Sequence, residues 1–318
     1  MPVLALLVIS WAGLQTARGP GQAELITGLE AFLDARLRQD EEAALIWLTK
    51  SARHQFTRAG EPITGTANPH WTYFAVLGWK GNEAIVAAHE GYSGVPYASY
   101  REERLAWGKV GGEWRIVRAR FSPRYTLRAS QDGTTLFFAT DTGTAAPGQP
   151  DGDGKWQERQ ESISPTVVLR LTDLPAEFTP AGASPEVRFG VGRARFGPLA
   201  FAPADPSRFA FSSSGVHGFV GLASRQGFER GLDLYFEGDV VEIRWSPQGQ
   251  YLLVDVLEPS GQVVTFIYDV VRGTRLPVER IRAYPAPIPP ELLSVSRLPA
   301  AHRVQTPAPV FPAPAAAF

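Results

Sequence analysis

The chain has 318 residues, long enough for two domains that each bury a core. Apolar residues make up 44% of the chain and charged residues 20%, the balance of an ordinary globular protein. A net charge of −1 gives no electrostatic support for a nucleic-acid partner, and the lack of cysteine excludes disulfides, thiolate metal sites and thiol nucleophiles.

An uncharged apolar run from Val3 to Leu14 opens the chain. Its length suits the hydrophobic region of a signal peptide and is short for a membrane-spanning helix. No basic residue precedes the run and no small-residue cleavage motif follows it, so an uncleaved anchor and a buried N-terminal helix or strand are alternatives. We assign residues 1–21 to a signal peptide or short membrane anchor. We expect a secreted protein or one anchored on the extracytoplasmic side of a membrane, the alternative being a cytoplasmic protein.

Residues 22–58 are predicted to form a helical hairpin, because apolar residues recur there at three- and four-residue spacing. Asp40 suits the N-cap of the second helix. From Trp71 the apolar period changes to two, which indicates strands. The strands are expected at 71–79, 84–92, 100–107 and 114–121. A helix pair followed by long antiparallel strands predicts an α+β domain with a curved sheet wrapped over its helices.

Two segments of this region carry a family resemblance. The helix pair ELITGLEAFLDARLRQDEEAALIWLTKSARHQF and the hairpin YREERLAWGKVGGEWRIVRARF resemble the NTF2-like superfamily. The last strand of that family typically carries a Gly-x-Trp-x-Ile-type sequence, and Gly112-Glu113-Trp114-Arg115-Ile116 matches it. The resemblance covers about residues 22–121. It implies a conical sheet that encloses a pocket with its helices, and it leaves the activity open because the fold hosts many functions.

Residues 122–282 are predicted to be β-rich, with an exposed loop at 144–165. The stretch from Trp245 to Val254 (WSPQGQYLLV) indicates strand, tight turn and strand, with Gly249 able to take a positive φ. Weaker copies of this unit begin at Ser130 and Ala202. Ala202 and Ser246 are spaced like successive propeller blades of roughly 40–45 residues, which favours a repeat architecture.

The strand Val263–Asp269 and the following Val270-Val271-Arg272-Gly273 resemble the outer strand of a TolB-like or WD40-like propeller blade. Three copies, or four with a degenerate one in 166–190, are few for a closed propeller of about four to eight blades. The alternatives are therefore an open array of blades, a minimal ring or a sandwich of similar hairpins. Residues 283–318, rich in Pro and Ala, are predicted to form a flexible tail.

Few residues suggest chemistry. The histidines lack the spacing of a zinc site, and Asp151-Gly152-Asp153-Gly154 lacks the later ligands of a calcium loop, so we expect neither a metal nor a cofactor. One candidate pocket lies in the NTF2-like part. An apolar pocket raises the pKa of a carboxylate, and a tyrosine there can stabilise a forming oxyanion. His89 and Glu90 are adjacent on a strand, so at most one enters the pocket. The candidate lining residues are Trp79, His89, Glu90, Tyr92 and Trp107.

These observations predict a non-catalytic, extracytoplasmic binding or scaffolding protein. Its partner would be a protein, peptide, glycan or small ligand rather than a nucleic acid. One alternative is an isomerase- or hydratase-type enzyme that uses the NTF2-like pocket. Another is a homo-oligomer assembled through unpaired β edges.

Overall fold

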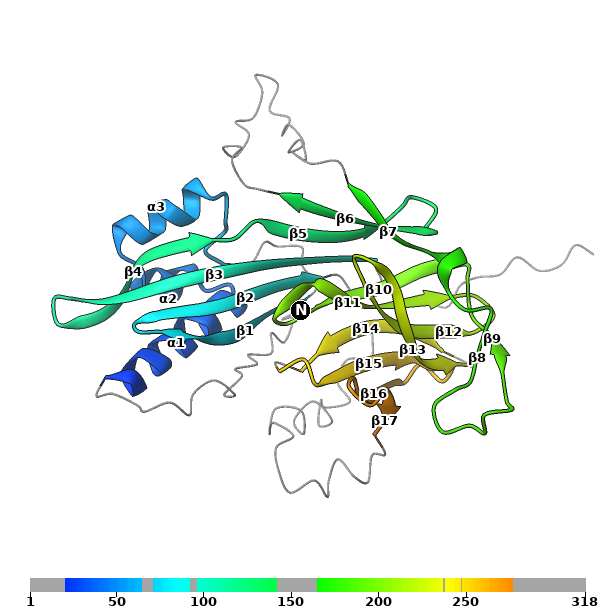
Figure 1. The fold of residues 1–318 in the computed structure, drawn as a ribbon. Coiled ribbons are helices and arrows are strands. Elements are labelled where there is room, and N and C mark those ends of the chain that lie inside the picture. Colours follow the sequence, from blue (N-terminus) through cyan, green and yellow to red (C-terminus); the bar gives the residue numbers. More distant parts are fainter. Residues whose placement is uncertain are drawn as a thin grey trace, which may run out of the picture. The chain divides into compact units, whose positions relative to one another are not determined.

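The computed structural model describes residues 21–64, 71–91, 96–141, 165–236, 238–246 and 248–276. Within these ranges the chain is mostly antiparallel β-sheet with a few helices near its start (Figure 1). The apolar run Val3–Leu14, the loop 144–165 except its last residue, and the tail 283–318 lie outside the described residues.

Helix α1 (Gln22–Leu37) buries the predicted apolar stripe, and Asp40 caps α2 (Glu41–Ile46) by accepting the Ala43 N–H at 3.0 Å. The second predicted helix is interrupted, and α3 (Lys50–Arg58) begins after Thr49. The break lies where the chain meets strand β4 (Glu113–Phe121). Ile116 donates its N–H to the Trp47 carbonyl and accepts the N–H of Thr49, at 2.7 and 3.1 Å. Backbone hydrogen bonds to a strand distant in sequence therefore replace one helical turn.

The first sheet has the order β1-β2-β3-β5-β6-β7, with β4 also paired to β3. On its edge away from β2, the long strand β3 has two neighbours, since Tyr97–Tyr100 pair with β5 and Glu103–Val110 pair with β4. The sheet is thus continuous across residue 121, where the sequence predicts the end of the α+β domain. Its strands are β1 (Trp71–Lys80), β2 (Glu83–Gly91), β3 (Tyr97–Val110), β4 (Glu113–Phe121), β5 (Arg124–Ala129), β6 (Thr135–Asp141) and β7 (Thr166–Arg170).

Two four-stranded antiparallel meanders follow, and each has the strand order expected of a blade-like hairpin repeat. The first contains β10 (Arg195–Ala202), β11 (Asp205–Ser214), β12 (Gly218–Ser224) and β13 (Gly227–Tyr235). The second contains β14 (Asp239–Trp245), β15 (Tyr251–Leu257), β16 (Val263–Asp269) and β17 (Thr274–Arg275). Between β7 and β10 lie the short elements η1 (Leu171–Asp173), β8 (Glu177–Phe178) and β9 (Phe189–Gly190).

Two of the three predicted copies of the turn have the same hydrogen bonds. Ser130 and Ser246 each accept, on Oγ, the N–H of the residue five positions later, at 3.0 and 2.9 Å. Gly133 and Gly249 have φ of 74° and 69° and donate to the carbonyl of their serine. The third copy differs. Ala202 pairs with Asp205, so its loop is two residues shorter and has no hydroxyl.

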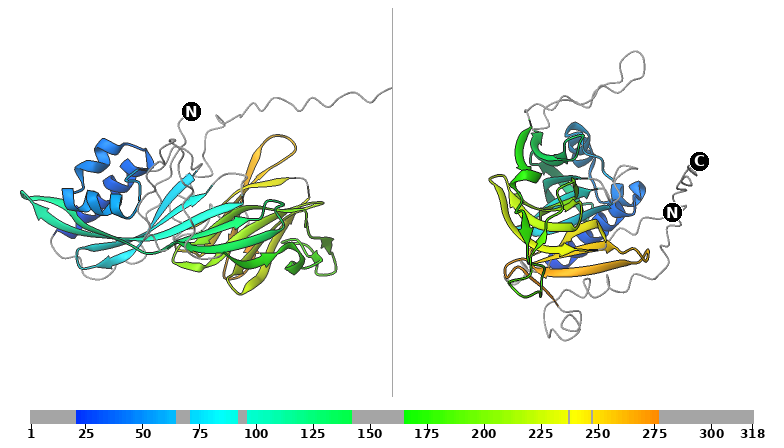
Figure 2. Two further views of the ribbon diagram at one scale, coloured as in Figure 1. Left: turned by 90° about the horizontal axis from the view of Figure 1, so that it is seen from above. Right: turned by 90° about the vertical axis from the view of Figure 1, so that its right-hand side faces the viewer.

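Three apolar cores hold these layers together. One lies between the helices and β1–β4, which the helices cover on one face (Figure 2). A second joins the other face of the first sheet to β10–β13, and a third joins β10–β13 to β14–β17. Trp245 of β14 connects its sheet to β10, since its indole N–H donates to the Ala200 carbonyl at 3.0 Å.

Candidate functional site

The structure separates the residues that the sequence proposes for one pocket. Trp79 and Trp107 belong to the core between helices and sheet, and Trp107 packs edge-on against Trp47 at 5.9 Å between ring centroids. Neither tryptophan lines the pocket described below. Glu90 does line it, and Tyr92 lies outside the described residues.

His89 lies on the opposite face of the sheet from Glu90, as the alternation of a strand requires. Its ring is 1% exposed, stacks on Tyr73 at 4.3 Å and meets the edge of Tyr100 at 5.0 Å. Burial lowers the pKa of His89 to about 3, and the smaller effect of the Pro203 carbonyl opposes that shift. The imidazole is therefore neutral at physiological pH, and its Nε2 has no hydrogen-bond partner among the described residues.

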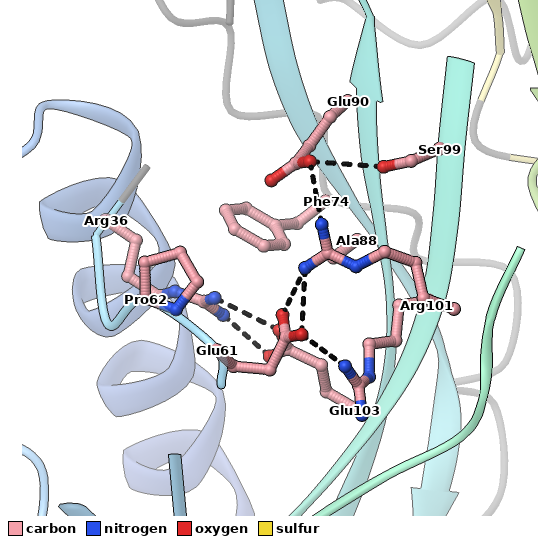
Figure 3. A pocket seen from close by; sticks show the side chains of 10 residues that line it. Arg36, Glu61, Pro62, Phe74, Ala88, Glu90, Ser99, Arg101 and Glu103 are labelled. Atoms are coloured by element: carbon pink, nitrogen blue, oxygen red, sulfur yellow. Dashed lines mark hydrogen bonds and ion pairs between the residues drawn. The ribbon is translucent and has the colours of Figure 1, made fainter. Parts of the chain in front are cut away.

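The pocket lies where α1 and the segment after α3 face the first sheet (Figure 3). The space open to the centre of a water molecule is about 20 Å³, and one water needs roughly 10–15 Å³ of such space. As it stands, the pocket has room for a water or a small ion. Its lining residues are Arg36, Glu61, Pro62, Phe74, Ala88, Glu90, Ser99, Arg101, Glu103 and Arg124.

Arg36 and Glu103 form a fully buried ion pair at the base of the pocket. The Arg36 guanidinium donates to both oxygens of Glu103, at 2.6 and 3.0 Å, and the two side chains are 5% and 0% exposed. The Arg36 Nε–H donates to the Ile63 carbonyl, and its guanidinium lies over the Phe74 ring at 4.5 Å. This side chain therefore joins α1, the segment after α3 and the sheet.

Glu61 is the centre of a second ion-pair group. It accepts a hydrogen bond from Arg101 of β3 (Figure 3). It also accepts hydrogen bonds from Arg124 of β5, at 2.8 and 2.7 Å to its two oxygens. Burial lowers the pKa of Arg101, and the nearby Glu61 opposes that shift. For Arg124 burial also lowers the pKa, but Glu61 and Glu90 more than offset it and the net shift is upward. Both guanidinium groups are positively charged.

Glu90 lies toward the solvent side of the pocket. Its Oε2 accepts the Ser99 hydroxyl at 3.1 Å and is 3.5 Å from Nη1 of Arg124. The side chains of Glu90 and Arg124 are 22% and 20% exposed, more than those of the other charged lining residues. Each carboxylate of the pocket thus has at least one arginine partner.

Five charged residues of the pocket were not predicted from the sequence: Arg36, Glu61, Arg101, Glu103 and Arg124. A signal was present in β3, where Arg101 and Glu103 share the period-two face of Leu105 and Trp107. Charged residues on an otherwise apolar face require partners. Those partners come from α1, from the segment after α3, and from β5. No local sequence pattern predicts which residues they are.

Among the described residues, no group of His, Asp and Glu is arranged to hold a metal ion. A search of the described helices for one long and apolar enough to cross a membrane finds none.

Comparison with known proteins adds little. No family model matches the chain, and a search of the curated proteins finds no match. Two solved structures of the COPII coat on membranes, one of them of its outer coat vertex, are similar at 12% identity with TM-scores of 0.25. Each alignment covers 64% of this chain but 48% and 27% of the other chains. Likeness at this level carries no argument about function.

Proposed function

We propose that the protein is a non-catalytic binding or scaffolding protein that works outside the cytoplasm. The observation that carries the non-catalytic part is the pairing in the pocket. Glu61, Glu90 and Glu103 each have an arginine partner, and His89 is buried on the other face of the sheet. A general base must reach the proton that it abstracts, and these groups are already engaged.

The proposed location follows from the apolar run Val3–Leu14, which suits a signal peptide or a short anchor. The proposed partner is a protein, peptide, glycan or small ligand. A net charge of −1 argues against nucleic acid.

The architecture supports this role if two finer assignments hold. We assign α1–α3 with β1–β4 to an NTF2-like cone, and we assign the blade-like sheets that follow to an open or minimal propeller. Both architectures present concave surfaces or sheet edges to a partner.

Fractionation of cells that carry a C-terminally tagged full chain tests the location. We expect the chain in the extracytoplasmic or membrane fraction, and we expect a variant lacking residues 3–14 in the cytoplasm. If the full chain and the variant both fractionate with cytoplasmic proteins, the proposed location is wrong.

The alternative of an isomerase or hydratase has its own test. An enzyme that uses Glu90 as a base would accelerate deuterium exchange at the carbon next to a ketone, and Glu90→Gln would abolish that exchange. We expect no exchange above buffer for the full chain with a panel of small enolisable ketones in D₂O. Exchange that depends on Glu90 would replace the binding proposal with the enzyme.

The alternative of a homo-oligomer rests on the sheet edges. Within the described residues β1 pairs only with β2, which leaves one edge of the first sheet without a neighbouring strand. Light scattering of the full chain over a range of concentrations would reveal assembly, whereas a monomer throughout would exclude it.

A further inference from the structure

Two arginines of the first sheet share one carboxylate that does not belong to the sheet. Arg36 and Glu103 satisfy each other, so the remaining charges of the pocket are Arg101 and Arg124 against Glu61 and Glu90. Glu90 approaches Arg124 only at 3.5 Å, while Glu61 bonds to both guanidinium groups. Without Glu61, these two guanidinium groups would face one carboxylate, Glu90, which among the described residues pairs only with Arg124.

Glu61 enters the pocket from the helix layer. Gly60, just beyond the C-cap of α3, has φ of 65°, and the Glu61 N–H donates to the Phe56 carbonyl at 2.9 Å. The backbone of Glu61 is therefore fixed to the helix end, and its side chain alone reaches the two arginines. Rotation of that side chain would free both guanidinium groups without breaking a strand pairing.

The arginines retain unused donors. The Nε–H groups of Arg101 and Arg124 are buried and have no hydrogen-bond partner among the described residues. The Arg101 side chain is 7% exposed, and both residues line the pocket. A buried donor without an acceptor is costly, so the site can accept more oxygen atoms than Glu61 supplies.

We propose that Arg101 and Arg124 form a binding site for the carboxylate of a small ligand, and that Glu61 fills this site when no such ligand is bound. Guanidinium groups bind carboxylates through paired, charge-assisted hydrogen bonds, which is the chemistry Glu61 already uses here. The inference rests on the proposed function only in treating the pocket as a binding site. It names the ligand class, a small carboxylate that must displace Glu61.

Chemical rescue tests the proposal. Glu61→Ala keeps the β-carbon and removes the remainder of the side chain, a fragment with the size and charge of acetate. The full chain, Glu61→Ala and the control Glu113→Ala are melted in increasing sodium acetate. Glu113 is 70% exposed and is paired with Arg115, so its loss removes a carboxylate outside the pocket. Sodium chloride at the same concentration controls for ionic strength. Acetamide, which has the shape of acetate without its charge, controls for shape.

We expect acetate to raise the melting temperature of Glu61→Ala saturably, by about 2–6 °C, because a ligand that binds only the folded state stabilises it. Chloride and acetamide should not reproduce this rise. The full chain and Glu113→Ala should show a much smaller acetate-specific rise, since acetate must there compete with Glu61 for the two arginines. Adding Arg124→Ala to Glu61→Ala should remove the acetate effect.

Equal responses of Glu61→Ala to acetate and chloride would overturn the inference. If Glu61→Ala does not fold in buffer, the comparison becomes its refolding yield in each solute. Recovery in acetate alone supports the site, and equal recovery or none contradicts it. A failed rescue leaves the location and exchange results untouched, so failure here is distinguishable from failure of the proposed function.

Discussion

His89 and Glu90 are consecutive on β2, yet they serve opposite faces of the first sheet. Glu90 lines the polar pocket under the helices, while His89 stacks on Tyr73 in the core that faces β10–β13, close enough to the Pro203 carbonyl of the β10–β11 turn for that carbonyl to affect its pKa. One dipeptide therefore couples the helix-covered half of the chain to the blade-like half.

His89 should make the stability of the protein depend on pH. Burial lowers its pKa to about 3 from an ordinary value of 6.5. The unfolded chain therefore binds more protons between these values, and stability is lost as pH falls below about 6.5, by about 1.4 kcal/mol per unit. From pH 7 to 5 this loss is about 2 kcal/mol. In urea titrations at pH 7 and pH 5, the free energy of unfolding of His89→Phe should fall between the two pH values by about 2 kcal/mol less than that of the parent chain.

His89→Phe keeps an aromatic ring of similar size beside Tyr73 and removes the buried Nε2 that has no partner among the described residues. Its stability at pH 7 should therefore stay within about 1.5 kcal/mol of the parent chain. His54→Gln, on the exposed side of α3, controls for the loss of a histidine. Equal pH dependence in His89→Phe and the parent chain would show that another group governs acid stability.

Removing one partner of the Arg36–Glu103 pair should lower the free energy of unfolding strongly. Replacing both partners with apolar residues should lower it much less. Arg36→Met leaves the carboxylate of Glu103 buried and unpaired, which costs about 3–5 kcal/mol. The double variant Arg36→Met with Glu103→Leu removes both charges, and we expect it to regain most of that loss. Urea denaturation of both single variants and the double variant measures the coupling. A single Arg36→Met cost below about 1 kcal/mol would contradict a fully desolvated pair.

Periodicity predicted much of the local structure. The run Val263–Asp269 forms β16 as expected, and Asp40 caps a helix. The interruption between α2 and α3 was not predictable, because Ile116 of β4 supplies its hydrogen bonds. The sequence up to residue 58 carries no trace of that strand.

The pocket was predictable only in part. Strand alternation predicts that at most one of His89 and Glu90 enters a pocket, and in the structure Glu90 lines the polar pocket while His89 does not. Trp79 and Trp107 pack in the core because a large apolar ring gains more from burial than from lining a polar cavity. The ion pairs join residues far apart in the sequence, such as Arg36 and Glu103, so their pairing is a property of the tertiary fold.

The shared turn of Ser130 and Ser246 should be sensitive to its hydroxyl. Ser246 is fully buried, and its Oγ accepts the Tyr251 N–H at 2.9 Å. Ser246→Ala leaves that N–H without this acceptor and should lower the free energy of unfolding by about 1 kcal/mol or more. Ser130→Ala should act in the same direction with a smaller effect, since its turn is more exposed. Thermal melts compare the two, and the hydroxyl has no role in the turn if neither variant is destabilised.

Gly192 should tolerate no side chain, whereas Gly78 should accept one. A β-carbon on Gly192 would lie 1.9 Å from the His217 carbonyl oxygen, and the nearby Ser214 and Gly215 contacts are also backbone. The backbone would have to shift, so Gly192→Ala should cost more than about 2 kcal/mol. Gly78 lies in β1 with no atom within 4 Å of an added β-carbon. Gly78→Ala should therefore be neutral or stabilising by up to about 1 kcal/mol, because alanine restricts the unfolded chain. Urea titration of the matched pair decides the matter, and equal costs would mean that the contact between Gly192 and His217 does not constrain the fold.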